Sequence, residues 1–395
     1  MSTAVVGRLY ESALPLAASQ KRSTDLRRVR NLIAERAEEL ARLTGLPVAE
    51  ALVSQVLPLA DACRFLETQA DRILAPQRLP ASGRPFWMRD VEIEVRREPF
   101  GTVLVIAPSN NHLFLPAVHT LQALVAGNSV MWKPGRGGQP AAEAFAKILD
   151  TDRLQVLDEN IETADLGADL VVFTGSAETG EKVLSQLADS VTPAVMELSG
   201  HDAVFVREDA DLDLVVRAIE FGTKLGKGEV CMRPRRVFVH KSVAGELQQR
   251  LGGIEVNSVG SDDEALELAA KNPFALGASV FGREPGTTVL ARRVRAGAVT
   301  VNDLIVPTAD PRFPFGGRGR SGFGVTRGAE GLLAMTQIKA IAVRRGRARP
   351  HLNVAGANDA ELFASYIRAA HGGTLGERWR GLVNFIQAAM RRRKS

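Results

Sequence analysis

Residues 170–176, with the sequence Leu-Val-Val-Phe-Thr-Gly-Ser, decide the fold class of this chain. Leu170–Phe173 is an apolar run of strand length, and the turn that follows it leads into a helical stretch. Similar apolar runs lie on both sides, at Thr102–Ala107, Ser129–Trp132, Ala194–Leu198, Ala203–Val206 and Val237–Val239. Helical stretches such as His112–Ala126 and Asp209–Thr223 separate several of them. Short apolar strands that alternate with helices predict an α/β fold with a parallel sheet.

The residues before this region predict helices and then an extended arm. Apolar positions from Leu26 onward follow helical spacing, with Ser23 or Thr24 as the expected N-cap and Gly45 as the end. The second helical pattern contains Cys63 within its apolar stripe, so we expect this cysteine in the core. Val91–Val95 alternates with charged residues, which is typical of an exposed or intersubunit strand.

Composition favours a globular protein without a metal centre. Of the 395 residues, 45% are hydrophobic and 24% charged, and no stretch approaches the roughly 20 apolar residues that span a bilayer. The two cysteines, Cys63 and Cys231, form no disulfide framework, and six scattered histidines lack metal-ligand spacing. We therefore expect a cytoplasmic protein. Residues 344–395 contain eleven Lys or Arg against three Asp or Glu, so the net charge of +5 arises in the tail.

Cys231 is the best candidate for a nucleophile. It follows Gly-Lys-Gly-Glu-Val in an expected loop before the strand at residues 236–240. The cations Lys227, Arg233, Arg235 and Arg236 flank it, and nearby cations favour the thiolate. A lone loop cysteine is also compatible with a small residue that fills a tight turn.

The sequence around Cys231 resembles aldehyde dehydrogenases. Gly228-Glu229-Val230-Cys231 is similar to the Gly-Gln-x-Cys nucleophile signature of that family, with Glu229 in place of Gln. Glu197-Leu198-Ser199-Gly200 resembles its Glu-Leu-Gly-Gly motif. Further matches follow the order of the family, at 99–101, 106–110, 127–134, 173–176, 301–303, 314–317, 321–324 and 335–339. The resemblance spans roughly residues 26 to 343. It implies a Rossmann-like cofactor domain joined to a shortened α/β catalytic domain.

The resemblance assigns three catalytic roles. Cys231 would attack an aldehyde, and hydride loss would leave a thioester. The Asn110 amide and the Cys231 backbone N–H would stabilise the oxyanion. Glu197 would activate the water that hydrolyses the thioester, a task suited to a carboxylate whose pKa is raised by partial burial. Taken singly, Glu197 is equally compatible with a structural ion pair, and Asn110 with a helix N-cap.

The same resemblance implies that NAD or NADP is the cofactor. The expected contacts are Ile106, Ala107, Pro108, Ser109, Lys133, Arg136, Gly175, Ser176 and Leu198. Gly175 and Ser176 follow a strand and open a helix, whose N–H groups can face a pyrophosphate. Arg136 stands where the family often has an acidic residue, so it could favour NADP or be a surface charge. The formal GxGxxG match at Gly317–Gly322 follows no strand and is interpreted as a structural loop.

The chain departs from the family pattern after Cys231. Several dozen residues of the usual catalytic domain are absent, together with the Glu-x-Phe-Gly-Pro segment that binds the nicotinamide ribose. Glu255 is a weak substitute. Ser199 replaces a glycine, and His201 replaces a common lysine. Two alternatives therefore stay open: a cofactor-binding pseudoenzyme or interaction protein with degraded catalysis, and an acylating enzyme that exchanges the acyl group with coenzyme A.

The predicted organisation has four parts. Residues 1–85 and 99–198 form the N-terminal helices and the cofactor-binding domain, 86–98 an oligomerisation arm, 199–343 the shortened catalytic domain, and 344–395 a basic tail. The arm resembles the family's oligomerisation strands, which implies a homodimer or larger assembly. In the tail, a helix from Trp379 to Met390 places apolar residues on one face with arginines around it. This helix is expected either to touch an anionic membrane surface or a partner, or to dock on the protein itself. Nucleic-acid binding is not expected.

Overall fold

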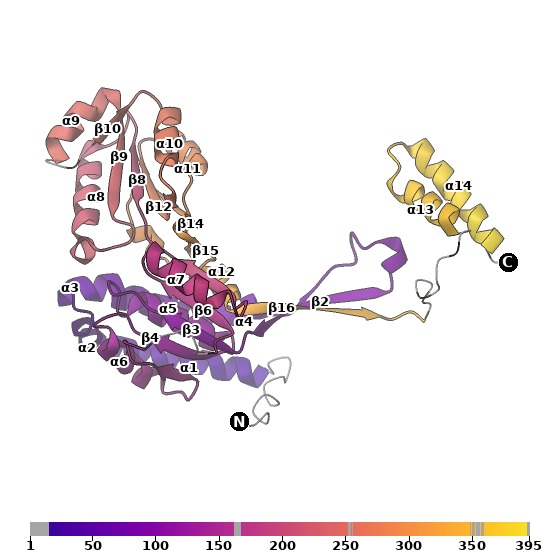
Figure 1. Ribbon diagram of the computed structural model, residues 1–395, viewed down its shortest axis with the longest axis horizontal. Helices are drawn as coiled ribbons and strands as arrows, with labels where there is room; N and C mark the ends of the chain where they lie inside the picture. The colour runs from indigo at the N-terminus through magenta and orange to yellow at the C-terminus, as the bar shows by residue number, and fades with distance from the viewer. Residues whose placement is uncertain are drawn as a thin grey trace. The chain divides into compact units, whose positions relative to one another are not determined.

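The computed structural model describes residues 16–161, 167–251, 254, 256–347, 349, 352, 356 and 359–392 (Figure 1). Its chain divides into two compact units. Unit 1 consists of Met1–Arg78 and Glu94–Ile341, and unit 2 of Leu79–Ile93 and Ala342–Ser395. Among the described helices, none combines the length and apolar character needed to cross a membrane.

Unit 1 contains a six-stranded sheet with the order β15-β7-β6-β3-β4-β5. Its strands are β3 (Thr102–Ile106), β4 (Ser129–Lys133), β5 (Leu154–Val156), β6 (Leu170–Thr174), β7 (Ala194–Glu197) and β15 (Gly322–Phe323). Neighbouring strands are parallel except β15, which pairs antiparallel with β7. The apolar run Leu170–Phe173 therefore lies in β6, between β3 and β7. The predicted α/β fold with parallel strands is confirmed.

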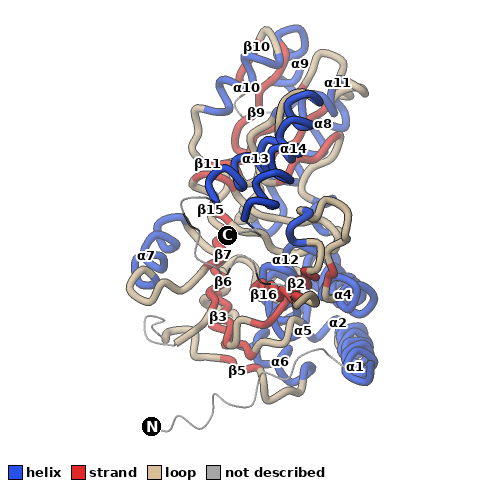
Figure 2. Tube along the Cα trace, turned by 90° about the vertical axis from the view of Figure 1, so that its right-hand side faces the viewer, coloured by secondary structure: helices blue, strands red, loops and turns tan. Residues whose placement is uncertain are grey.

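Alternating side chains of this sheet face two different helical layers. Val103 and Val105 pack in a core with the helices α1 to α6, whereas Leu104 and Ile106 pack on the opposite face with α7. Figure 2 shows α7 on one side of the sheet and α1, α5 and α6 on the other. The helices are α1 (Leu16–Glu35), α2 (Ala37–Arg42), α3 (Val48–Ala51), a π-helical turn (Leu52–Val56), α4 (Leu57–Leu74), α5 (Phe114–Val125), α6 (Gln139–Leu149) and α7 (Ala177–Leu187). A sheet covered on both faces explains why its strands are apolar without alternation.

A second sheet in unit 1 has five strands in the order β10-β9-β8-β12-β13, all parallel. They are β8 (Asp202–Val206), β9 (Pro234–His240), β10 (Val256–Val259), β12 (Gly277–Phe281) and β13 (Ala298–Val301). Helices α8 (Leu212–Lys224) and α9 (Lys241–Leu251) pack on one face, and α10 (Asp262–Ala270) and α11 (Gly286–Arg293) on the other. Only residues 252–255 connect α9 to β10.

The chain passes from the first sheet to the second between Glu197 and Asp202. The predicted boundary between residues 198 and 199 falls in this connection and stays a prediction. Short elements complete unit 1: β1 (Gln77–Arg78), β11 (Phe274–Ala275), β14 (Arg318–Gly319), α12 (Gly328–Ala334), and 3-10 turns at Leu225–Gly228 and Val306–Ala309. The GxGxxG stretch forms the loop that carries β14 and β15, as interpreted from the sequence.

Two strands of a small sheet, ordered β1-β2-β16, continue from unit 1 into unit 2. They are β2 (Val91–Pro99) and β16 (Thr336–Arg344). Unit 2 also contains a 3-10 turn (Phe86–Met88) and the helices α13 (Asp359–His371) and α14 (Leu375–Arg392). These two helices pack closely, because a Cβ on Gly381 would clash with the backbone of Ala369, and the Tyr366 and Phe385 rings lie 5.4 Å apart.

Two local predictions need correction. The first helix begins at Leu16, before the expected caps Ser23 and Thr24, and it is interrupted at Arg36 before α2 ends at Arg42. The apolar spacing marked the part of the helix that contains the buried Leu26, Val29 and Ile33, and gave no sign of the turns before it. Cys63, in contrast, is fully buried in α4 as predicted, and burial raises the pKa of its thiol to about 12.

Candidate active site

The predicted site residues gather where the strands of the first sheet end. Ile106 ends β3, Lys133 ends β4, and Glu197 ends β7. Because these strands are parallel, their carboxyl ends lie at one edge, and ligands of such sheets bind outside that edge. The loop that carries Cys231 comes from the second sheet and reaches the same place.

Glu197 is buried, with 2% of its surface exposed. One carboxylate oxygen, Oε2, accepts a hydrogen bond of 3.2 Å from the Thr326 hydroxyl, whereas Oε1 has no hydrogen-bond partner. Burial raises the pKa of the Glu197 carboxyl, and Arg327 and Thr326 partly oppose this rise. The raised pKa agrees with the expectation for a general base.

Cys231 lies at the end of a strained turn. Gly226, Lys227 and Gly228 all have positive φ angles, of 57°, 57° and 78°. The Cys231 carbonyl packs so closely against Gly200 that any Cβ there would clash with it. Cys231 is thereby fixed beside the Glu197–Asp202 connection, with its residue only partly exposed.

The expected activation of Cys231 by its neighbours in sequence is wrong. Arg235 donates to the Gly200 carbonyl, Arg236 to the His201 carbonyl, and Lys227 to the Gly45 carbonyl. Burial raises the pKa of the Cys231 thiol, and the Glu197 and Asp202 carboxylates raise it further. The cation that opposes them is Arg327, which lies almost a hundred residues away in the sequence.

Asn110 connects the cofactor-binding sheet to the nucleophile loop. Its Nδ2 donates a hydrogen bond of 2.6 Å to the carbonyl of Glu229, two residues before Cys231. One of the two amide hydrogens is therefore engaged with backbone, and the other is free to act as a donor. Asn110 and the nucleophile loop are thereby held together.

Sequence reasoning missed three buried titratable residues around this centre: His119 on α5, Asp202 on β8 and Arg327 before α12. Burial lowers the pKa of His119 to about 3 and raises that of Asp202 to about 7. None of them belongs to a motif, so the signal that could have found them is the improbability of ionisable side chains inside apolar segments.

At the cofactor edge, the turn after β4 approaches the segment after β3. A Cβ on Gly135 would clash with the Pro108 carbonyl, so this turn requires glycine. Lys133 Nζ donates to the carbonyl of Glu159, 2.7 Å away, and Arg136 is exposed. Of the other predicted contacts, Ala107 and Pro108 are buried and Ser109 is exposed.

The turn between β6 and α7 has most of its first N–H groups occupied within the protein. The Ser176 hydroxyl caps α7 by accepting from Thr179 N, and Gly175 N donates to the Glu197 carbonyl. Ala177 N donates to the Ser199 hydroxyl at 3.3 Å. Ser199, the departure from the family glycine, therefore links the start of α7 to the segment that follows Glu197. Leu198, another predicted contact, is buried.

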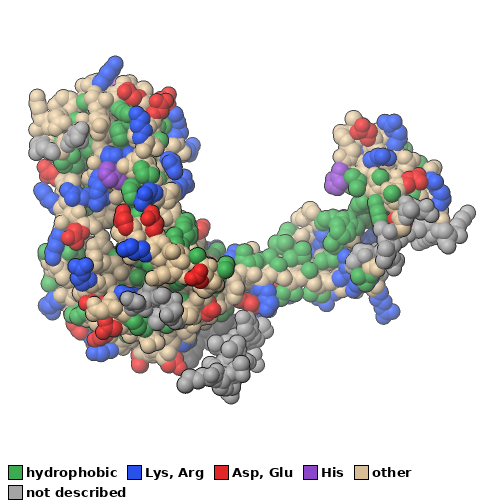
Figure 3. Space-filling view, viewed as in Figure 1, with side chains coloured by type: hydrophobic (Ala, Val, Ile, Leu, Met, Phe, Trp, Pro, Cys, Tyr) green, Lys and Arg blue, Asp and Glu red, His purple; other side chains and the backbone are tan. Residues whose placement is uncertain are grey.

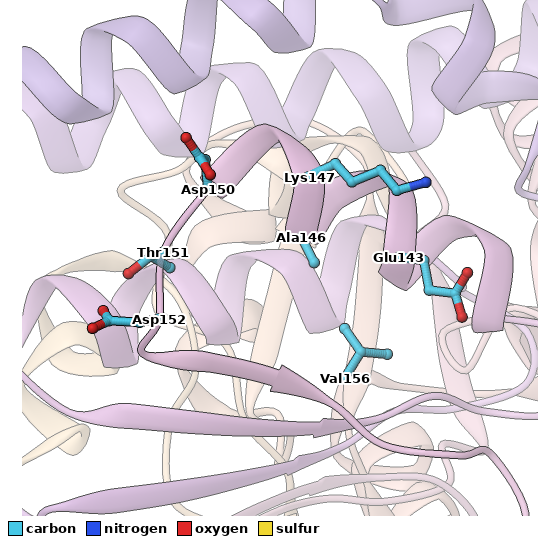
Figure 4. Close-up of a pocket in the computed structure, with 7 residues that line it drawn as sticks. All are labelled: Glu143, Ala146, Lys147, Asp150, Thr151, Asp152 and Val156. Atoms are coloured by element: carbon cyan, nitrogen blue, oxygen red, sulfur yellow. The ribbon is translucent and has the colours of Figure 1, made fainter.

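A surface hollow near α6 is not this site (Figure 4). Asp150, Thr151 and Asp152 precede β5, so they lie at the amino edge of the sheet, opposite to Glu197. The hollow is lined by Glu143, Ala146, Lys147, Asp150, Thr151, Asp152 and Val156. None of these residues was predicted to bind substrate or cofactor.

Comparison with known proteins identifies the family. The sequence profile of the aldehyde dehydrogenase family matches residues 12–253 and 254–341. The chain belongs to this family. It is an NAD(P)-dependent enzyme that oxidises aldehydes. Because the match breaks between adjacent residues 253 and 254, the profile agrees with a shortened segment at the α9–β10 connection.

Curated relatives of this aldehyde dehydrogenase include two enzymes named for diapolycopene aldehydes. The 4,4'-diapolycopene aldehyde oxidase of Methylomonas sp is 27% identical, with 81% of this chain and 76% of the relative covered. The 4,4'-diapolycopene-4,4'-dial dehydrogenase of Cytobacillus firmus is 24% identical, with 84% of this chain and 91% of the relative covered.

Solved structures share the fold of this aldehyde dehydrogenase. The NAD-dependent aldehyde dehydrogenase of Sinorhizobium meliloti has a TM-score of 0.78 and 24% identity, with 85% of this chain and 84% of the neighbour covered. PnpE in complex with nicotinamide adenine dinucleotide has a TM-score of 0.76 and 21% identity, with 84% and 87% covered. The predicted aldehyde dehydrogenase-like fold is confirmed. Glu255, the suggested substitute for the missing ribose contact, lies outside the described residues.

Proposed function

We propose that this aldehyde dehydrogenase converts an aldehyde to a carboxylic acid through a thioester on Cys231, with Glu197 as general base. The observation that carries the proposal is the shared site of Cys231 and Glu197. The carboxylate is buried and close enough to raise the pKa of the thiol, and one of its oxygens has no partner. An unpartnered buried carboxylate oxygen beside a thiol is suited to accept a proton.

In the first half-reaction, the Cys231 thiol loses its proton to Glu197 and its sulfur attacks the aldehyde carbon. The C–S bond forms while the carbonyl π electrons move to oxygen. Because the resulting oxyanion needs preorganised donors, we assign them to the second Asn110 amide hydrogen and the Cys231 backbone N–H. The contact between Asn110 and Glu229 supports this assignment, since it fixes both donors relative to each other.

Before the second half-reaction, Glu197 releases its proton to solvent. It then takes a proton from water. The hydroxide oxygen adds to the thioester carbon, the C–S bond breaks, and the acid and the Cys231 thiolate are released. When bound, NAD(P)⁺ supplies the hydride acceptor that makes the intervening oxidation possible. The sum is one aldehyde, one NAD(P)⁺ and one water converted to one carboxylate, one NAD(P)H and two protons.

The proposed cofactor contacts are those at the carboxyl edge: Ile106, Ala107, Pro108, Ser109, Lys133, Arg136, Gly175, Ser176 and Leu198. Gly135, in the turn after β4, lies close to the Pro108 carbonyl and has no side chain. This supports the placement, because no side chain at residue 135 fills the carboxyl edge of the sheet. NAD and NADP both remain candidates, and the exposed Arg136 would favour a 2′-phosphate. Comparing the Kd values of NAD and NADP for the native protein and Arg136→Glu tests that contact directly.

The mechanism is tested by rapid mixing with an aldehyde and NAD(P)⁺. Native protein is expected to turn over, Cys231→Ala to form no NAD(P)H, and Glu197→Gln to release about one NAD(P)H per site and then stall as a thioester. Mass spectrometry of stalled Glu197→Gln identifies the acylated cysteine. If native protein gives a single burst of NAD(P)H and turns over further only when coenzyme A is added, the result would support acyl transfer instead. Absence of NAD(P)H from native protein across a broad aldehyde panel, with no cofactor binding, would support a pseudoenzyme.

We further propose that the aldehyde is apolar. Two relatives are named for diapolycopene aldehydes, and a cluster of apolar side chains that includes Val230, Ile305 and Phe313 packs at the nucleophile loop. An apolar wall favours an apolar substrate because burial removes hydrocarbon from water. The kcat/KM for a long unsaturated aldehyde should exceed that for a quaternary-ammonium aldehyde by at least about tenfold; the reverse order contradicts the proposal.

We propose a homodimer or larger assembly through the arm around residues 86–98. In support, β16 is an edge strand of the three-stranded sheet, and Phe86, Trp87 and Ile338 are exposed. An open edge beside exposed apolar residues favours pairing with another chain. Sedimentation of the native protein and of Ile338→Glu tests this, and a monomeric native protein contradicts it.

A cytoplasmic location is also proposed, supported by two unpaired cysteines.

We propose that α14 docks on an anionic membrane surface. Its apolar residues Trp379, Leu382, Val383, Ile386 and Met390 are all exposed, and hydrophobic side chains are visible over unit 2 (Figure 3). Arg378 lies on one side of this stripe and Arg380 and Arg391 on the other, at helical spacing. An apolar stripe with flanking arginines fits anionic lipid. A second copy on the same face would instead bring like charges together.

Vesicle co-sedimentation tests this docking. Native protein should bind phosphatidylserine-containing vesicles at low salt, and much less at high salt or with phosphatidylcholine alone. Trp379→Ser with Ile386→Ser should reduce binding at least about fivefold. Val191→Ser, which changes a side chain 86% exposed before β7, is the matched control. Equal binding by the double variant, or its conversion from dimer to monomer, contradicts membrane docking.

A further inference from the structure

Arg327 is a buried guanidinium in an unusual backbone position. Only 5% of its surface is exposed, and its φ angle of 61° is one that side chains other than glycine rarely adopt. Nη1 donates 2.5 Å to the Thr308 carbonyl, and the guanidinium carbon lies 4.2 Å from the Phe315 ring centroid and 5.7 Å from that of Phe114. Burying a cation is costly unless negative charge lies nearby.

The negative groups available to Arg327 are the two reacting groups. It forms no ion pair within 4.0 Å with any carboxylate of the described residues, yet it acts electrostatically on Glu197 and Cys231. Its Nε and the Oε1 of Glu197 are both buried without partners. The preceding residue, Thr326, donates to the other oxygen of the same carboxylate. Two adjacent residues before α12 thus act on Glu197. Thr326 donates a hydrogen bond to it, and Arg327 acts on it through its charge.

We propose that Arg327 is the counter-cation of the reaction centre, a positioning residue that balances the single negative charge shared by Cys231 and Glu197. This inference rests on the proposed function. When the thiol proton moves to Glu197, the negative charge moves to sulfur and the total does not change. The oxyanion then carries this charge until hydride leaves, and Glu197 becomes negative again by releasing its proton to solvent before hydrolysis. One fixed cation matches one anion at each of these stages in a site that excludes water.

The titratable groups around Arg327 determine how its effect on the Cys231 thiol must be measured. Glu197 on β7 and Asp202 on β8 raise the pKa of the Cys231 thiol, and Arg327 lowers it. His119 on α5 faces Arg327, and because its pKa is lowered to about 3 it stays neutral at assay pH. Asp202, whose pKa is raised to about 7, titrates within the measured range. Every Arg327 comparison is therefore repeated with Asp202→Asn, so that this second titration is removed.

The test is the pH dependence of Cys231 alkylation by iodoacetamide in the full chain without cofactor, with the label located by mass spectrometry. Arg327→Gln keeps a donor for the Thr308 carbonyl but removes the charge, and Arg327→Lys keeps the charge. We expect Arg327→Gln to move the alkylation midpoint by about one pH unit or more to higher pH, and Arg327→Lys to stay near native. Removing a cation raises a thiol pKa, which fixes the sign.

A purely structural role gives a different result: both variants would lose thermal stability and activity together, with unchanged midpoints in the folded fraction. Equal midpoints for Arg327→Gln and native protein overturn the proposal. If Arg327→Gln does not fold, either of two other results overturns the proposal. One is an alkylation midpoint of Arg327→Met equal to that of native protein. The other is an alkylation midpoint of Arg327→Lys shifted to lower pH. Failure of Cys231 as nucleophile is distinguishable, because Cys231→Ala would then keep turnover whatever the Arg327 variants do.

Discussion

At the residue scale, the sequence could identify Cys231, Glu197 and Asn110 because each lies in a short motif with its own chemistry. It could not identify what surrounds them. The cations beside Cys231 in the sequence donate to backbone carbonyls, whereas the cation that acts on its thiol is Arg327. Arginine side chains are long enough to turn away from their sequence neighbours, so adjacency in sequence does not establish electrostatic contact.

Asn110→Ala tests the oxyanion assignment. The change removes a proposed donor and the hydrogen bond to the Glu229 carbonyl. We expect kcat to fall about 100- to 1000-fold, the usual effect of losing one oxyanion donor, with the Kd of the cofactor within about threefold of native. Steady-state kinetics and cofactor titration measure both quantities. A loss confined to KM would assign Asn110 to substrate binding alone.

Asp202→Asn tests the cost of a buried carboxylate. The folded-state pKa of Asp202 is raised to about 7 by burial, above its ordinary value of 3.8. Between about pH 4 and pH 7 the folded protein therefore keeps a proton that the unfolded chain releases, so stability falls as pH rises across this range and levels off above it. Asparagine keeps an acceptor for Gly277 N without the charge. At pH 8 the variant should be more stable by up to about 4 kcal/mol.

The measurement is denaturant unfolding of both proteins at pH 5 and pH 8. The advantage of Asp202→Asn should shrink at pH 5, where the native Asp202 is protonated and the buried charge disappears. A constant difference between the two pH values would show that Asp202 does not titrate as the structure indicates. Asp263→Asn, at an exposed position on α10, is the matched control and should show no comparable pH-dependent gain.

At the element scale, apolar runs predicted the strands that are buried on both faces, and helical spacing predicted α5 and α8 within a few residues. The first turns of α1 and the short strand β5 carried no such signal. Sequence also could not show how the nucleophile loop meets the first sheet. That meeting depends on Gly200, where a backbone contact with Cys231 leaves no room for a Cβ.

Gly200→Ala should therefore impair chemistry more than folding. The added Cβ would clash with the Cys231 carbonyl and displace the nucleophile loop. We expect kcat to fall at least about 100-fold, because small displacements of reacting groups have effects of that order, while cofactor affinity changes little. Gly245→Ala in α9, where a Cβ meets nothing within 4 Å, should keep native kcat and be slightly stabilised. Similar kinetics for the two alanine variants would remove the proposed role of the contact.

At the scale of the whole molecule, the fold class and the family could be inferred from the sequence because ordered motifs extend over most of unit 1. The location of charge could be inferred as well, since the basic residues concentrate after residue 343. What could not be inferred is that α13 and α14 form a closely packed pair in a separate unit. The apolar stripe of α14 is visible in the sequence at helical spacing. Its exposure is not, because it depends on which face of α14 packs against α13.

Ending the chain after Gly346 tests how independent unit 1 is. All five described hydrophobic cores, and every residue proposed for catalysis or cofactor binding, belong to unit 1. The truncated protein should therefore bind NAD(P) normally and turn over a water-soluble aldehyde within about threefold of native kcat, because local stability follows from buried contacts. Its binding to anionic vesicles should be lost. If instead the truncated protein binds cofactor but loses turnover, the tail contributes to the active site, and α14 must be reassigned from membrane docking to catalysis.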